Sequence, residues 1–319
     1  MIVTVTLNPA LQVRYDADRL ELGALNQVGR VRHEASGRGL AVARLLQTFG
    51  HEVVAAGLAG GSSGELIRAE LARSGVPSQF TRINAESRRA LRIADAATGQ
   101  VTTLAEPAPY ITTEELGRLA ADFRALLDGA TAVVLCGSLP AGLPAETYGS
   151  LTSYAARAGV PVILNAGGSA LQQAASRGPA LVIPDEIAPG DANAAALIAA
   201  GTRAVVLQAD HSVRAVTGDG EWRAATRSAG RPDDAALAQR ELTAQPELTE
   251  SGRRDALVAG FVPGIVLGWS WPDMLRHAVA LAESVTPAGD VDLAAYEALL
   301  STIRVTGPRS APWLQAEPA

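Results

Sequence analysis

Residues 2–7, Ile-Val-Thr-Val-Thr-Leu, form a short apolar run that ends at the dipeptide Asn8-Pro9. A continuous run of aliphatic and β-branched residues that a proline terminates is typical of a strand buried in a parallel sheet. The same stretch has neither the basic segment nor the long apolar core of a signal peptide. We therefore interpret residues 2–7 as the first core strand and expect a cytoplasmic protein.

Further apolar runs alternate along the chain with amphipathic stretches of helical length. This alternation is typical of a parallel sheet covered by helices, so it predicts the α/β class. The expected core strands are 52–58, 132–136, 161–165, 180–183 and 204–208, and the expected helices are 40–49, 65–74, 113–127, 145–158 and 256–268.

Two stretches, about 12–34 and 88–106, show short alternation instead, with a turn at Thr98-Gly99-Gln100. Such a pattern predicts antiparallel hairpins with one exposed face. A small sheet cannot bury its apolar face alone, so we expect it to cover a ligand or to form a dimer contact. Residues 224–250 show no clear period and are expected to form a loop, with one helical turn at 235–242.

The basic residues are all arginine, because the sequence contains no lysine. This excludes a Walker phosphate loop, a lysine Schiff base and a lysine general base. The net charge of -6 argues against nucleic-acid binding, and no apolar run reaches the roughly 18 residues of a membrane span. Small anions remain possible ligands for clustered arginines.

Cysteine and histidine give no sign of a metal site. The single cysteine, Cys136, follows the apolar residues 132–135 and is interpreted as a small buried thiol that allows no intramolecular disulfide. The histidines lack ligand spacing and are interpreted as surface or loop residues; they are His33, His51, His211 and His277.

Several segments carry a family resemblance by their order and spacing. They are Leu-Asn-Pro-Ala-Leu at 7–11, Ser-Gly-Arg-Gly-Leu-Ala-Val-Ala-Arg-Leu-Leu at 36–46, Gly-Ser-Leu-Pro-Ala-Gly-Leu-Pro at 137–144 and Asp-Ala-Leu-Val-Ala-Gly-Phe at 255–261. Together they resemble the ribokinase (PfkB) family of carbohydrate kinases, and within it the 1-phosphofructokinases and tagatose-6-phosphate kinases.

The resemblance implies one ribokinase-like domain over residues 1–319, with a three-layer α/β/α body. It also implies a small protruding β-sheet lid from about 12–34 and 88–106, a homodimer through that lid, and phosphoryl transfer from magnesium-ATP to a sugar phosphate such as fructose 1-phosphate.

On the substrate side, the resemblance assigns sugar or phosphate binding to Gln12, Gly37, Arg38, Gly39, Arg88 and Arg92. Gln12 stands where the family has aspartate, and Arg38 stands where the family has lysine. Three family asparagines are replaced by Ala41, Ala90 and Ala105, which cannot form side-chain hydrogen bonds. We expect a phosphate or phosphosugar near Arg38, Arg88 and Arg92.

The catalytic turn of the family, Gly-Ala-Gly-Asp, reads Gly252-Arg253-Arg254-Asp255 here. The resemblance implies that Asp255 is the catalytic base and that Gly252 and Arg254 lie at a helix N-terminus that stabilises the transferred phosphoryl group. Asp255 can equally be a first-turn acid that complements the helix dipole.

The nucleotide side departs further from the family. The resemblance assigns it to Asp185, Gln208 and Asp210. Ala209 and Ser212 introduce Cβ atoms where family glycines approach the nucleotide closely, and Leu207 replaces a family serine. Asp185 or Glu186 either binds a metal or caps a helix, and the metal stays unknown.

Three functions follow as alternatives. The favoured one is a phosphosugar-binding or anion-binding protein with weak or no kinase activity, which needs no cofactor. The second is an active sugar-phosphate kinase that uses magnesium-ATP with Asp255 as base. The third is a dimeric scaffold for protein interaction.

Overall fold

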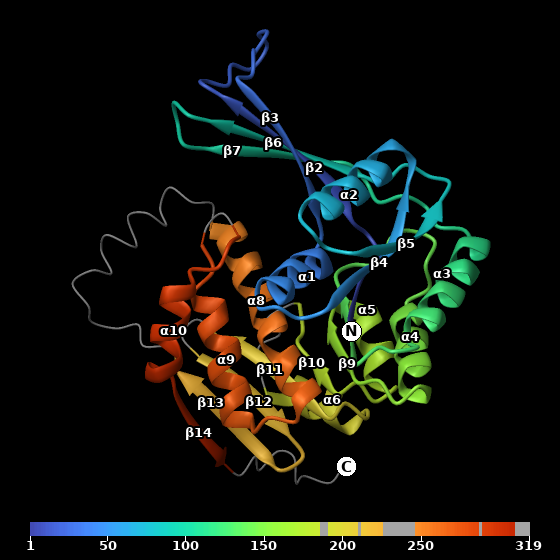
Figure 1. The fold of residues 1–319 in the computed structure, drawn as a ribbon, viewed down its shortest axis with the longest axis vertical. Helices are drawn as coiled ribbons and strands as arrows, with labels where there is room; N and C mark the ends of the chain where they lie inside the picture. Colours follow the sequence, from blue (N-terminus) through green and yellow to red (C-terminus); the bar gives the residue numbers. More distant parts are fainter. Residues whose placement is uncertain (186–190, 210–211, 226–245, 287–288, 310–319) are drawn as a thin grey trace.

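The computed structural model describes residues 1–185, 191–209, 212–225, 246–286 and 289–309. The expected loop at 224–250 falls largely outside these residues, as do Glu186, Asp210 and His211. The chain forms an α/β body around a large sheet, from which a second, smaller sheet protrudes (Figure 1). The predicted fold class is therefore confirmed.

The strands of the large sheet are β1 (Ile2–Thr6), β4 (Val53–Gly60), β5 (Ser78–Ile83), β8 (Ala132–Cys136), β9 (Val162–Asn165), β10 (Leu181–Val182), β11 (Ala204–Ala209), β12 (Ser212–Thr217), β13 (Gly220–Ala225) and β14 (Arg304–Arg309). The small sheet contains β2 (Ala10–Ala17), β3 (Arg30–Ser36), β6 (Arg89–Asp95) and β7 (Val101–Ala105). The helices are α1 (Arg38–Thr48), α2 (Gly61–Arg73), α3 (Thr113–Leu126), α4 (Thr147–Arg157), α5 (Gly168–Ala175), α6 (Asp191–Ala199), α8 (Pro246–Leu267), α9 (Trp271–Glu283) and α10 (Leu293–Thr302).

Strand β1 lies inside the large sheet, whose order is β14-β13-β12-β11-β10-β9-β8-β1-β4-β5. It pairs in parallel with β4 and β8, and all of its residues are buried. Ile2 packs with α1, α8 and α9 on one face, whereas Val3 and Val5 pack with α3, α4 and α5 on the other. The predicted three-layer body follows from these two cores.

The sequence did not predict the antiparallel extension β12–β13–β14 or the edge strand β5. Strands β5, β12 and β13 mix buried and accessible residues, and residues 304–308 of β14 are all at least partly accessible. Arg214 on β12 pairs with Glu221 on β13. Half-exposed strands with charged cross-strand pairs lack the continuous apolar run that marks a central parallel strand.

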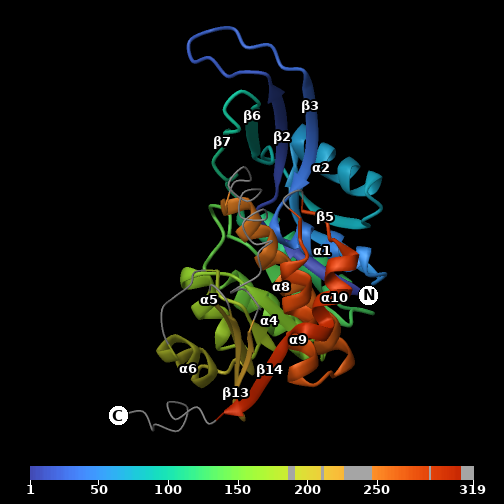
Figure 2. The same ribbon diagram turned by 90° about the vertical axis from the view of Figure 1, so that its left-hand side faces the viewer.

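The small sheet has the order β3-β2-β6-β7 and stands off the body (Figure 2). Its hairpins are antiparallel as expected, but β2 and β6 pair in parallel. Leu91 and Ile93 share one face. Val101 lies on the opposite face, contrary to expectation, because it pairs with Ala94.

Helix α8 begins ten residues earlier than the predicted start at 256. The expectation that Asp255 lies in a first helical turn is therefore wrong. Residues 246–251 are mostly polar and show no apolar period, so the sequence pattern did not indicate this part of the helix. Gly260 lets α9 pack closely on α8, because a Cβ there would lie 2.4 Å from Cα of Ala278.

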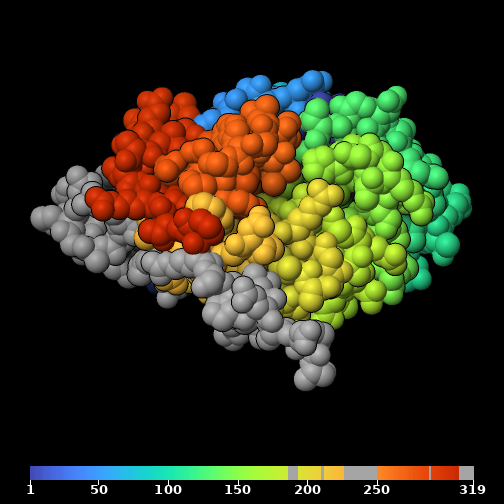
Figure 3. All heavy atoms as spheres, turned by 90° about the horizontal axis from the view of Figure 1, so that it is seen from below, coloured from blue at the N-terminus to red at the C-terminus, as the bar shows by residue number. Residues whose placement is uncertain are grey.

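The C-terminal helices α9 and α10, in orange and red, lie beside the yellow and green middle of the chain at the end opposite the small sheet (Figure 3). His277 on α9 is partly buried among the rings of Phe49, Trp269 and Tyr296, so its interpretation as a surface residue is wrong. Burial lowers its pKa. Within the described residues, no helix combines the length and the apolarity that crossing a membrane requires.

Candidate active site

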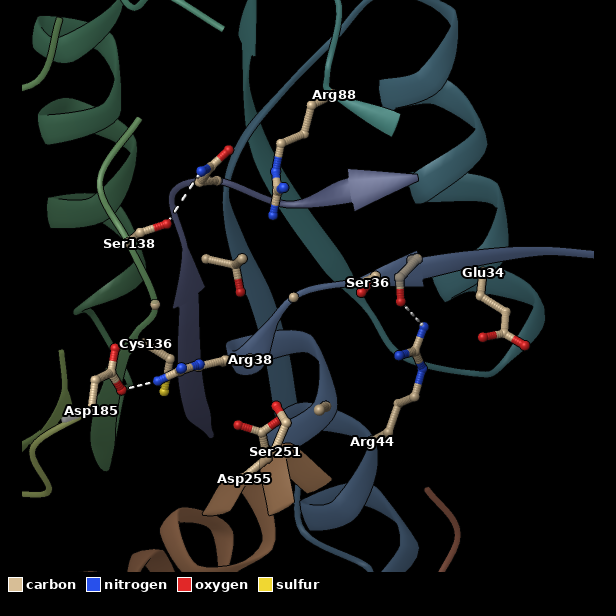
Figure 4. Close-up of a pocket in the computed structure, with 16 residues that line it drawn as sticks. Glu34, Ser36, Arg38, Arg44, Arg88, Cys136, Ser138, Asp185, Ser251 and Asp255 are labelled. Atoms are coloured by element: carbon tan, nitrogen blue, oxygen red, sulfur yellow. Dashed lines mark hydrogen bonds and ion pairs between the residues drawn. The ribbon is translucent and has the colours of Figure 1, made fainter. Parts of the chain in front are cut away.

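A cavity of about 440 Å³ opens at the carboxyl ends of the parallel strands β1 and β8, beneath the small sheet (Figure 4). This edge of an open α/β sheet is where ligands bind by preference. The cavity is lined by Thr6, Asn8, Glu34, Ala35, Ser36, Gly37, Arg38, Ala41, Arg44, Arg88, Cys136, Gly137, Ser138, Asp185, Ser251 and Asp255.

Gly37 and Gly39 bring the start of α1 against β1. A Cβ at Gly37 would lie 2.7 Å from Cγ2 of Thr6, and a Cβ at Gly39 would lie 2.5 Å from Oγ1 of Thr6. Gly37 also has φ of 153°, in the region that L-residues rarely adopt. Both glycines are therefore needed to place Arg38 at the cavity wall.

Arg38 reaches across the cavity to the ends of two other strands. Its Nη1 donates to Oδ1 of Asp185 in an ion pair and to Oδ1 of Asn165 at 3.2 Å. Asn165 is itself fixed, because its Nδ2 donates to the carbonyl of Ile183 at 2.8 Å. The arginine expected to meet a phosphate thus already has a carboxylate partner.

Gly252 and Arg254 lie inside α8, so their N–H groups bond within the helix and are not free donors at its N-terminus. This corrects the expectation of a free anion-binding turn at these residues. The Arg254 guanidinium donates to the Asp185 carbonyl at 2.7 Å and to Oε1 of Glu250 at 3.0 Å. Both contacts hold it beside Asp185 rather than in the cavity lining.

Asp255 faces the cavity from α8 and is 6% exposed. Burial raises the pKa of Asp255 to about 7, although Arg38 and Arg254 act to lower it. Its Oδ1 accepts no hydrogen bond from any described residue. A buried carboxyl with an open acceptor and a pKa near neutrality can take a proton from a hydroxyl placed beside it.

Arg88 enters the cavity from the base of the small sheet, on the side opposite Arg38 and Asp255 (Figure 4). Within the described part of the chain, its guanidinium has no ion pair, and its buried Nε has no hydrogen-bond acceptor. Burial lowers the pKa of Arg88. A partly buried cation without a partner is a candidate binding group for an anion.

The other predicted residues lie outside the cavity lining. Gln12 donates to Oε2 of Glu34 at 3.1 Å and so touches the site through that residue. Arg92 lies further out on β6, in register with Arg14. Gln208 lies at the end of β11, where its Oε1 is buried without a hydrogen-bond partner among the described residues.

Several lining residues had no predicted role. Asn8 donates to Oγ of Ser138 at 3.3 Å, and Arg44 donates to the carbonyl of Ala35 at 2.7 Å. Asn8 directly follows the first strand motif, and Ser138 follows β8 after one residue. Ligands bind by preference at the carboxyl ends of such strands, so the positions of these two residues in the sequence could have indicated a site. Glu34 and Ser251 gave no comparable signal.

The described residues contain no cluster of three or more His, Cys, Asp or Glu side chains able to hold a metal ion. Asp185, the acid with a possible metal role, is paired with Arg38. A magnesium ion would compete with a guanidinium for this carboxylate, so the arrangement does not fit magnesium-ATP at Asp185.

The model of the pfkB family carbohydrate kinases matches residues 10–220 of this chain. Solved structures match nearly the whole fold. A putative phosphofructokinase from Staphylococcus aureus aligns with a TM-score of 0.79 and 23% identity, over 96% of this chain and 98% of that chain. A possible 1-phosphofructokinase from Thermotoga maritima aligns with a TM-score of 0.79 and 21% identity, over 96% of this chain and 99% of that one.

Phosphofructokinase-2 from Escherichia coli in complex with fructose-6-phosphate aligns with a TM-score of 0.76 and 22% identity, over 94% of this chain and 98% of that chain. At such identities these likenesses concern the fold. The matched family segment ends before Asp255.

The raised pKa of Asp255 predicts a pH-dependent cost to stability. Below about pH 4 the carboxyl is protonated in both states, whereas between about pH 4 and 7 it ionises only in the unfolded chain, which favours unfolding. The free energy of unfolding of Asp255→Asn should therefore rise relative to that of the wild type as the pH increases to about 7. At about 1.4 kcal/mol per pKa unit, the difference should reach a few kcal/mol, which denaturant unfolding measures. A difference that stays constant from pH 4.5 to 8.5 would contradict the raised pKa.

Proposed function

We propose that this chain, which belongs to the pfkB family of carbohydrate kinases, binds a phosphorylated ketohexose or a related phosphate anion and transfers phosphoryl groups weakly or not at all. The observation that carries the proposal is Arg88, a partly buried guanidinium that faces the cavity without an ion-pair partner among the described residues. The cavity of about 440 Å³ has the size of a small-ligand site.

A phosphate suits this cavity better than a neutral sugar does. A desolvated guanidinium without a partner is costly, and a phosphate offers it two parallel charge-assisted hydrogen bonds. Ala41 lines the cavity where the family carries a hydroxyl-binding asparagine, so fewer side chains there can bind a neutral hydroxyl.

Weak transfer is supported by the groups around Asp255. Phosphoryl transfer depends on donors and cations that neutralise the charge of the moving group. Here the N–H groups of Gly252 and Arg254 lie within α8, the Arg254 guanidinium is bonded to Asp185 and Glu250, and Asp185 is paired with Arg38. We infer weak nucleotide affinity, since Leu207 and Ala209 also replace smaller or polar family residues.

An active sugar-phosphate kinase remains the second candidate, because Asp255 is buried at the cavity with a pKa of about 7, close to working pH. If turnover of fructose 1-phosphate or fructose 6-phosphate with magnesium-ATP occurs, Asp255→Asn should lower its rate constant about a hundredfold or more. A coupled assay measures this. Turnover that survives the substitution would remove Asp255 from the catalytic role.

We further propose that the small sheet acts as a lid and a homodimer contact. Val31 and Leu104, on its apolar face, are 49% and 55% exposed. Two copies that bury this face against each other would remove it from water. The alternative function as a scaffold for protein interaction rests on the same face of the small sheet. It is favoured only if the cavity binds no anion.

The dimer proposal predicts that Leu104→Glu converts the dimer into monomers, because a carboxylate would be desolvated at the contact. Light scattering at micromolar concentration measures the mass. Leu66→Glu is the matched control, since Leu66 is 42% exposed but lies on α2. A wild type that is monomeric, or a Leu104→Glu variant that stays dimeric, would contradict the proposal.

The binding proposal predicts that millimolar fructose 6-phosphate raises the melting temperature of the wild type and not of Arg88→Ala. A ligand at one hundred times its dissociation constant adds about 2.7 kcal/mol to the free energy of unfolding. Arg89→Ala is the control, because the neighbouring Arg89 pairs with Glu106 instead of facing the cavity.

The proposal fails if fructose 1-phosphate, fructose 6-phosphate, tagatose 6-phosphate and inorganic phosphate all leave the melting temperature unchanged. It fails equally if Arg88→Ala keeps the full shift.

A further inference from the structure

The ion pair between Arg38 and Asp185 lies inside the same cavity that Arg88 faces. Both residues line the cavity, and both are partly buried. The guanidinium of Arg38 meets the carboxylate directly, and the side-chain oxygen of Asn165 supports the contact at 3.2 Å. A carboxylate of the chain itself is therefore bound to a guanidinium that an anionic ligand would also bind.

We infer that Asp185 is an internal anion that competes with the ligand for Arg38 and so limits the affinity of the cavity for phosphate. The inference rests on the proposed function, because it concerns the same site. Carboxylate and phosphate are recognised by the same guanidinium fork, so the two anions seek the same hydrogen bonds.

Asp185 is held in this position by its backbone as well as by its side chain. Its N–H donates to the carbonyl of Ala166 at 3.0 Å, and its carbonyl accepts from Arg254 at 2.7 Å. A ligand can displace the carboxylate from Arg38 without moving the backbone of Asp185, because both anchors are bonds to its main chain. Displacement leaves a partly buried carboxylate without its cation, which is unfavourable.

Cations and acids both line the cavity. The lining cations are Arg38, Arg44 and Arg88, and the lining acids are Glu34, Asp185 and Asp255. Only Nη1 of Arg38 contacts Asp185 and Asn165, so a ligand can also approach the remaining donors of the guanidinium. Two anions then share one cation, and Asp185 weakens binding in this arrangement as well.

The opposite role for Asp185 is to hold Arg38 in position for the ligand. The two roles differ in sign. If Asp185 competes, removal of its charge strengthens phosphate binding, whereas if Asp185 positions Arg38, removal of its charge weakens phosphate binding.

The test is calorimetric titration of inorganic phosphate and of fructose 6-phosphate into the wild type and into Asp185→Asn. The amide keeps the shape of the side chain and removes its charge. We expect Asp185→Asn to bind both probes about tenfold more tightly or better, the scale of close charge pairs. Asp185→Ser serves as a second variant in case the first one folds poorly.

Glu34→Gln is the matched control for charge alone. Glu34 lines the same cavity, but its carboxylate accepts from Gln12 and forms no ion pair with Arg38. The phosphate affinity of this control should rise threefold or less, because the substitution removes a charge from the cavity without freeing the guanidinium of Arg38. In the double variant Asp185→Asn/Arg38→Ala, the tenfold gain should disappear.

Equal or weaker phosphate binding by both Asp185 variants, while the wild type binds, would overturn this inference and leave the proposed function standing. A gain in Glu34→Gln as large as that in Asp185→Asn would also overturn it. Binding by Asp185→Asn with none by the wild type would support it. If no variant binds either probe, the inference and the proposed function fail together.

Discussion

The close approach of α1 to β1 is the constraint on which the site depends. Gly37 and Gly39 lie so near Thr6 that any side chain at either position would collide with it. This contact places Arg38 at the first turn of α1, from which its guanidinium reaches the ends of β9 and β10. One packing contact between a helix and a buried strand thereby places in the cavity the guanidinium that pairs with Asp185.

The charges that follow from this placement are the basis of our proposal that the cavity binds an anion and transfers phosphoryl groups weakly or not at all. Arg38 is paired with Asp185, and Arg254 is bonded to the carbonyl of the same residue, so both guanidinium groups already have partners for which a moving phosphoryl group would have to compete. Arg88 stays without an ion pair within the described residues, and Asp255 keeps an open acceptor. The cavity thus contains a guanidinium without an ion pair among the described residues and an acid with a pKa of about 7, while the N–H groups of Gly252 and Arg254 lie within α8.

The sequence was sufficient to predict the buried parts of the fold. Strands such as β1 and β8 are continuous apolar runs, and glycines end several helices where predicted. The partly exposed strands β12 and β13 could not be recognised, because their pattern depends on a charged pair across the strands. The early start of α8 could not be recognised either, because its first turns carry no apolar period. For the site, the sequence pointed to Arg38, Arg88, Asp185 and Asp255 as separate candidates, but only the tertiary structure shows that Arg38 and Asp185 neutralise each other.

We propose that this member of the pfkB family has an anion site and binds magnesium-ATP only weakly. Calorimetric titration of magnesium-ATP in the presence of saturating fructose 6-phosphate tests that claim most directly, because the sugar phosphate completes the site before the nucleotide arrives. We expect no saturable binding of magnesium-ATP in the micromolar range. A micromolar or tighter dissociation constant would contradict it.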